Sequence, residues 1–188
     1  MKQNQYEKAL EMIRASNFSV KKLKYARGHD GDAMQADVYA NGTKIAEIWD
    51  DSYGAALSVH YMKTDKVALL TEFLDSLPSF RNADRGWDFA LEDEKRIDAE
   101  EFFWQLVTNA GVMKQFRAGM RKTMAILDGE VITWKWKAKD IDLPMRFRDG
   151  STRTPRQVVE AAGARLLTGM PEEEAFKLWE ANISEEVQ

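Results

Sequence analysis

The amino-acid sequence predicts an α+β fold, in which an antiparallel sheet from two hairpin regions carries helices on one face and at its ends. Two dipeptides, Asn41-Gly42 and Asp128-Gly129, each lie between runs typical of strands, which is the pattern of a two-residue hairpin turn. Apolar residues at helical spacing flank both regions. The chain is expected to form a single α+β domain over residues 1–188, with 79–122 as a candidate helical insertion.

The first half of the chain predicts a helix, four strands and a second helix. The first helix has an apolar stripe that repeats every three to four residues, formed by Tyr6, Ala9, Leu10 and Ile13. Strands are expected in SVKKLKYARG (19–28), QADVYA (35–40), TKIAEIW (43–49) and LSVHYM (57–62), with HDGDAM (29–34) as a loop. The second helix is expected to begin at a cap on Asp65 and to stop at Pro78.

The second half predicts further helices around a second hairpin. A polar and aromatic loop is expected over 79–96, followed by a capping box formed by Asp98 and Glu101. The helix that follows is expected to close at Gly111, before a shorter helix with Met113, Phe116 and Met120. After the hairpin around Asp128-Gly129, helices are predicted from Thr154-Pro155 and from Pro171, with a short strand in ARLLTG (164–169) between them.

Composition narrows the classes of function. The chain has no cysteine, which excludes disulfides, thiol nucleophiles and zinc–thiolate sites, and its two histidines leave little for acid–base catalysis. No apolar run is long enough to span a membrane, and the lack of cysteine fits a reducing cytosol, so a cytoplasmic setting is expected. The familiar phosphate-binding, nucleotide-binding and hydrolase motifs are absent, and no cofactor is expected.

The stretch VITWKWKAK (131–139) alternates tryptophan with lysine. In a strand, Trp134 and Trp136 share one face with Ile132 and Ala138, while the lysines lie on the other. Ile and Ala beside the indoles favour burial of that face, with the lysines in solvent. The alternative is that both rings are exposed and stack on nucleic-acid bases. Exposure of these two rings therefore discriminates between a protein-binding and a nucleic-acid-binding molecule.

Charge is distributed unevenly around the net value of −4. Residues 84–101 hold eight acidic and three basic residues, whereas 114–153 hold ten basic and five acidic residues. A dense acidic surface can pair with a basic protein or imitate a phosphate backbone, and a basic one can bind the opposite partner. The candidate partner-binding residues are Trp87, Asp88, Glu92, Asp93 and Glu94 in the acidic region, and Lys135, Lys137, Lys139, Arg146, Arg148 and Arg153 in the basic region.

A second group of polar residues raises the alternative of a divalent-metal nuclease. Carboxylates and imidazoles that two loops and a strand bring together are suitable ligands for a divalent ion, and the candidates are His29, Asp30, Asp32, Asp50, Asp51 and His60. Their spacing matches no metal motif, and Asp and Gly in HDGD and DDSYG are also what turns require.

Three segments together resemble a known group of proteins. They are NGTKIAEIWDDSYGAALSVHY (41–61), QFRAGMRKTMAILDGEVITWKW (115–136) and TPRQVVEAAGARLLTG (154–169). These resemble patterns in small uncharacterised proteins of phages and prophages, namely an aspartate- and glycine-rich turn between strands, a basic helix that runs into a strand, and a closing helix and strand. The resemblance implies a mobile-element source and a cytoplasmic setting, and it implies no known reaction.

The expected function is therefore that of a non-enzymatic accessory protein of a phage or mobile element, which binds and inhibits a host protein. By association with such accessory proteins, the expected partner is a nucleic-acid-handling defence complex such as a CRISPR effector or a restriction system. The alternative is direct nucleic-acid binding by residues 135–156, and the metal nuclease is the weaker third class. The oligomeric state stays open.

Overall fold

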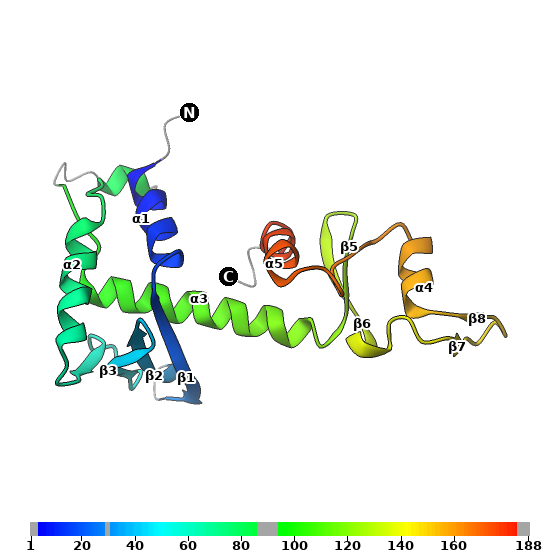
Figure 1. The fold of residues 1–188 in the computed structure, drawn as a ribbon, viewed down its shortest axis with the longest axis horizontal. Helices are drawn as coiled ribbons and strands as arrows, with labels where there is room; N and C mark the ends of the chain where they lie inside the picture. Colours follow the sequence, from blue (N-terminus) through cyan, green and yellow to red (C-terminus); the bar gives the residue numbers. More distant parts are fainter. Residues whose placement is uncertain (1–3, 29–30, 86–93, 184–188) are drawn as a thin grey trace. The chain divides into compact units, whose positions relative to one another are not determined.

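The computed structural model of the chain describes residues 4–28, 31–85 and 94–183 (Figure 1). The described residues combine helices with antiparallel sheets, so the predicted α+β class is confirmed. The chain divides into two compact units, unit 1 (Met1–Gly111) and unit 2 (Val112–Gln188). The single domain over 1–188 stays a prediction.

Unit 1 consists of a four-stranded sheet with helices on one of its faces. The strands are antiparallel in the order β1-β2-β3-β4. The elements, in chain order, are α1 (Gln5–Arg14), β1 (Phe18–Arg27), β2 (Asp32–Ala40), β3 (Thr43–Asp50), β4 (Ser58–Tyr61), the 3-10 turn η1 (Asp65–Val67), α2 (Ala68–Ser76), the 3-10 turn η2 (Asn82–Arg85) and α3 (Ala99–Gly119), which continues into unit 2.

The hairpin of β2 and β3 turns where the sequence predicts. Asn41 has a φ of 48° and Gly42 a φ of 79°, the positive values that a type I′ turn requires. In β2, before the turn, strand alternation places Met34, Ala36 and Val38 on one face of the sheet, where they are buried. The helices of unit 1 contribute to the same hydrophobic cluster, including Phe102 and Phe103 of α3. One face of the sheet is therefore the core of unit 1.

Helix α3 differs from its prediction. The helix does not end at Gly111, because residues 99–119 form one continuous helix. Glycine inside a helix costs only about 1 kcal/mol relative to alanine, which packing readily outweighs. A Cβ on Gly111 would lie 3.4 Å from the Tyr25 hydroxyl of β1, which is an ordinary van der Waals contact. The predicted cap is present, since the Glu101 backbone N–H donates to Asp98 Oδ1 at 2.8 Å.

Two smaller expectations for unit 1 are also corrected. The residue that caps the second helical segment is Thr64 rather than Asp65, because the Thr64 hydroxyl accepts the Lys66 backbone N–H at 3.2 Å. Residues 32–34, expected in a loop, belong to β2 and pair with the end of β1. Both differences concern the position of an element boundary, which is the least certain part of a sequence pattern.

Unit 2 contains a second antiparallel sheet, in the order β6-β5-β9, and a separate two-stranded ribbon. The two predicted hairpin regions thus lie in different sheets. The elements of unit 2 after the end of α3 are β5 (Lys122–Leu127), β6 (Glu130–Lys137), the 3-10 turn η3 (Ala138–Asp140), β7 (Met145–Arg146), β8 (Thr152–Arg153), α4 (Pro155–Ala161), β9 (Arg165–Leu166) and α5 (Glu172–Glu180).

The central strand β5 is covered on both faces. Met124 packs into one hydrophobic cluster with Phe116 and Trp179, from the end of α3 and from α5. Ala125, on the opposite face, packs into a second cluster with Val159 of α4. A strand that is buried on both faces fixes the register of its neighbours, because a slip by one residue would exchange the two sets. The predicted cap and proline of α4 are confirmed, with a capping box between Thr154 and Gln157.

Candidate functional site

A group of exposed cations lies along one end of the sheet in unit 2. We call it the basic strip and define it as Arg121, Lys122, Lys135, Lys137 and Lys139. Strand β6 is an edge strand, and its lysines at 135 and 137 are exposed, as the alternation predicts. The Ala138 N–H donates to the carbonyl of Arg121 at 3.0 Å, so the two chain segments remain side by side at this end.

The register brings two of these lysines face to face. Lys122 of β5 is paired with Lys137 of β6, and both side chains are exposed. Like charges at directly opposed positions on neighbouring strands destabilise a sheet. In the part of the chain that the structure describes, no carboxylate lies within ion-pair distance of either ammonium group. The fold therefore holds two like charges together, which favours an anionic partner at this position.

Sequence reasoning missed Arg121 and Lys122 as site residues. The register shifts between Lys122 and Thr123, whose partners are Lys137 and Trp134, so that β6 has two additional residues at this point. Such a bulge has no signature in a sequence that simply alternates. The signal that was available is the position of Lys122 at the start of a strand whose hairpin partner ends in lysines.

The two indoles lie on the face opposite to the lysines. Trp134 and Trp136 are half-buried and pack against the cluster formed by Ala125, Ile141 and Val159. Trp136 also meets Phe147 edge to face, with ring centroids 5.9 Å apart. The expectation that these rings pack inward is thus confirmed, although neither ring is fully buried. Neither of these two tryptophans lies on the face of the lysines.

The arginines of the predicted basic region divide into two groups. Arg153 donates a hydrogen bond to Asp149 at 2.8 Å and lies over the Phe147 ring. Its guanidinium group is therefore paired within the β7–β8 hairpin. Arg156 likewise bonds Asp142 at 2.6 Å, which lowers the pKa of that carboxyl group. Arg146 and Arg148 are exposed, and among the described residues neither has an acidic partner.

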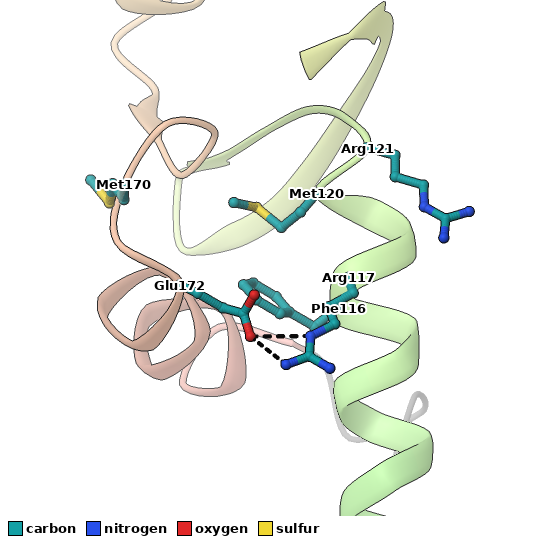
Figure 2. Close-up of a pocket in the computed structure, with 6 residues that line it drawn as sticks. All are labelled: Phe116, Arg117, Met120, Arg121, Met170 and Glu172. Carbon is teal, nitrogen blue, oxygen red and sulfur yellow. Dashed lines mark hydrogen bonds and ion pairs between the residues drawn. The ribbon is translucent and has the colours of Figure 1, made fainter. Parts of the chain in front are cut away.

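A shallow pocket lies beside the basic strip. It has a volume of about 270 Å³, and its lining residues come from the end of α3 and from the segment before α5. Figure 2 shows Phe116, Met120 and Met170 around the hollow, with an ion pair between Arg117 and Glu172 beside them. The Arg117 Nη2 and the Glu172 Oε1 are 2.6 Å apart. The Arg121 side chain points away from the hollow, so this residue belongs to both the pocket rim and the strip.

The acidic region is only partly described. Trp87, Asp88, Glu92 and Asp93 lie outside the described residues. Glu94 is exposed and accepts a hydrogen bond from the Ser79 hydroxyl. Other carboxylates of the segment have structural partners: Glu100 accepts the Leu57 backbone N–H at 3.0 Å, and Glu101 binds Arg85. The described part of the acidic region therefore contributes largely to the architecture of unit 1.

The histidine and aspartate candidates for a metal site do not converge where they are described. No group of three His, Asp or Glu side chains suited to a metal occurs in residues 4–28, 31–85 and 94–183. His29 and Asp30 lie outside these ranges. Asp50 and Asp51 accept the backbone N–H groups of Ser52 and Tyr53, at 2.8 and 3.3 Å, which is the ordinary role of aspartate in a turn.

Within the described ranges, none of the helices has the length and apolar character needed to cross a bilayer. Comparison of the chain with models of protein families, with curated proteins and with solved structures found no match in any of the three.

Proposed function

We propose that this chain is a non-enzymatic protein that binds an acidic surface of another protein through the basic strip of unit 2. The observation that carries the proposal is the opposition of Lys122 and Lys137 without a nearby carboxylate in the described chain. An acidic partner relieves the repulsion between the two lysines, so part of the binding free energy comes from the fold itself.

The surroundings of the strip favour a protein as the partner. Trp134 and Trp136, the rings interleaved with its lysines, pack toward the cluster on the opposite face and are turned away from the strip. At its Arg121 end, the strip meets the pocket with Phe116, Met120 and Met170. An apolar side chain flanked by carboxylates, a common arrangement on protein surfaces, fits both features at once.

The partner class that we propose is a host nucleic-acid-handling defence complex, in the cytoplasm of the host cell. The support is the resemblance of three segments to small phage and prophage proteins, together with the lack of cysteine and the two histidines, which offer little for catalysis. Binding at an acidic patch would inhibit the complex by blocking that patch. The acidic region at 84–101 stays a second predicted contact.

The experiment compares the wild-type chain with Lys137→Glu and with Lys114→Glu as the matched control. Lys114 is an exposed lysine of α3 in unit 2 and lies outside the strip. Each protein is titrated into purified CRISPR effector and restriction complexes, and both association and their DNA binding are measured. We expect Lys137→Glu to weaken association at least tenfold and the control to change it little. Association with none of these complexes, or equal loss in both variants, would contradict the proposal.

A second candidate is direct nucleic-acid binding by residues 135–156, favoured by the exposure of Lys135, Lys139, Arg146 and Arg148. Phosphate contacts release counterions, so this function predicts an affinity that falls steeply with salt. A gel shift at low salt with duplex DNA and RNA tests it. Binding that Arg146→Ala and Arg148→Ala weaken, for duplexes of any sequence, would favour this candidate over a protein partner.

A further inference from the structure

In the described residues, one face of the unit 1 sheet is turned away from the hydrophobic core, and we call it the open face. The other face of the sheet is the hydrophobic core, to which α1, α2 and α3 contribute in the described residues. Strand alternation therefore turns the intervening side chains away from the core. Trp49 and Lys21 on this outer side are exposed, and Tyr39 is half-buried. The charged and aromatic residues that give the open face its character are Lys21, Lys22, Asp37, Tyr39, Lys44 and Trp49.

The register aligns the outward residues in rows. Lys21 of β1 pairs with Asp37 of β2, which pairs with Glu47 of β3 and through it with His60 of β4. A neighbouring row contains Trp49 of β3, between Gln35 and Ser58. Tyr39 pairs with Lys44 at the other side of the first row. The open face thus places one aromatic ring on each side of a charged row.

The centre of the open face is a buried carboxylate that holds two lysines. Asp37 is 7% exposed, and its oxygens lie 2.7 Å from Lys44 Nζ and 2.9 Å from Lys22 Nζ. These hydrogen bonds, from Lys44 first and then Lys22, lower the pKa of Asp37. The carboxylate therefore stays charged at neutral pH and fixes both ammonium groups. Lys44 also pairs with Glu47, whereas the exposed Lys22 retains N–H donors for a second anion.

The position of Lys22 depends on an unusual backbone. The register of β1 against β2 shifts between Lys21 and Lys24, and Lys22 in this bulge has a φ of 53°. A lysine in the left-handed region costs free energy, and a bulge redirects a side chain. Here the redirected side chain reaches Asp37 on the open face and is 70% exposed. The strained backbone thus contributes a fixed cation to the open face rather than to the core.

The two aromatic rings of the open face differ in exposure. Trp49 is 41% exposed near the end of β3, whereas Tyr39 is half-buried. The Lys21 ammonium group lies 4.4 Å from the centroid of the Tyr39 ring, so a cation and a ring are already paired there. A flat surface with rings and lysines at strand spacing matches the arrangement that binds splayed bases and their phosphates.

Charge selects the sign of the partner. Lys21, Lys22, Lys24 and Lys44 outnumber Asp37 and Glu47 on this face, while the whole chain has a net charge of −4. From these features we infer that the open face of β1–β4 binds single-stranded nucleic acid, with Trp49 stacking on a base and the exposed lysines contacting phosphates. Single strands are specified because the bases of a duplex are stacked on one another and cannot reach the ring.

The test measures fluorescence anisotropy of labelled 15-nucleotide dT and rU oligomers on the full chain at low salt. We expect Trp49→Ala to weaken binding roughly 5- to 150-fold, as the loss of one stacked base does. Trp49→Phe retains a ring and should keep most of the affinity. Lys8→Ala, an exposed lysine on α1, is the control and should change nothing.

Salt dependence gives an independent readout. Each phosphate contact to a single strand contributes about −0.7 to the slope of log affinity against log salt, so Lys21→Ala with Lys24→Ala should reduce the slope by about 1.4. No binding of either oligomer, or equal affinity for a duplex or for poly-glutamate, would overturn the inference. Binding that Lys137→Glu removes and Trp49→Ala does not would place the site on the basic strip and overturn it as well. The proposed protein partner is unaffected by any of these outcomes.

Discussion

Asp37 in the middle of β2 and Lys44 near the start of β3 form an ion pair of 2.7 Å across these neighbouring strands. The carboxylate is buried, whereas the side chain of its second partner, Lys22, is 70% exposed. Desolvation of one charge is thus offset by two direct partners. The pair connects β2 with β3 and also fixes the position of a cation on the open face.

We expect Asp37→Asn to destabilise the fold by about 1.5–3 kcal/mol, the contribution of hydrogen bonds to a charged group. Asparagine keeps the shape of the side chain and removes its charge, so the change reports on the ion pairs rather than on packing. Urea unfolding measures the free energy of unfolding. Asp75→Asn, at an exposed position of α2, should stay within about 0.5 kcal/mol of the wild type. Equal effects of both substitutions would contradict the role given to Asp37.

The pH dependence of stability has a definite sign. The pKa of Asp37 is lowered below its ordinary value of 3.8 by the hydrogen bonds from Lys44 and Lys22. A carboxyl group with a depressed folded pKa contributes stability above its unfolded pKa, and this contribution is lost as the pH falls through the folded value. The difference in unfolding free energy between wild type and Asp37→Asn should therefore be constant above about pH 5 and shrink below about pH 4. A difference that grows on acidification would contradict this sign.

Some features of the fold could be predicted from the sequence and others could not, because only some depend on neighbouring residues alone. The turns at Asn41-Gly42 and Asp128-Gly129 could be predicted, because positive φ at both positions favours these residue types locally. The opposition of Lys122 and Lys137 could not, because it depends on a bulge. The open face was also invisible, since only the packing of α1, α2 and α3 on one side decides which side stays uncovered. Turns could thus be predicted from local residue types, whereas the residues that face one another across strands depend on tertiary structure and could not.

We expect Lys137→Glu to stabilise the fold while it weakens partner binding. Glutamate opposite Lys122 replaces a like-charge pair by an opposite-charge pair, which is worth roughly 0.2–1 kcal/mol in a sheet. Thermal unfolding at low salt measures the gain, and added salt should reduce it. Lys135 lies in the bulge of β6 and has no residue paired with it on β5, so Lys135→Glu should increase the stability less. A melting temperature below that of the wild type would show that the two lysines do not repel.

The two glycines in the second half of α3 should respond differently to alanine. A Cβ on Gly111 would lie 3.4 Å from the hydroxyl of Tyr25, the end of a half-exposed side chain that can move. Gly111→Ala should therefore stabilise the fold by up to about 1 kcal/mol through helix propensity. A Cβ on Gly119 would lie 3.1 Å from Met124 Sδ in the core, so Gly119→Ala should gain nothing or destabilise. Urea unfolding of the two variants measures the contrast, and equal gains would contradict it.

The turn after β3 packs on the end of β1 through Ser52 and Gly28. A Cβ on Gly28 would lie only 1.7 Å from the Ser52 hydroxyl, so Gly28→Ala should destabilise the fold by about 1–3 kcal/mol. Ser52 has a φ of 62°, which glycine adopts more readily, so Ser52→Gly alone should be neutral or stabilising. The double variant removes the clashing hydroxymethyl group and should recover most of the loss, as a double-mutant cycle measures. Additive effects would mean that glycine is required at position 28 for its backbone conformation and not for the close contact with Ser52.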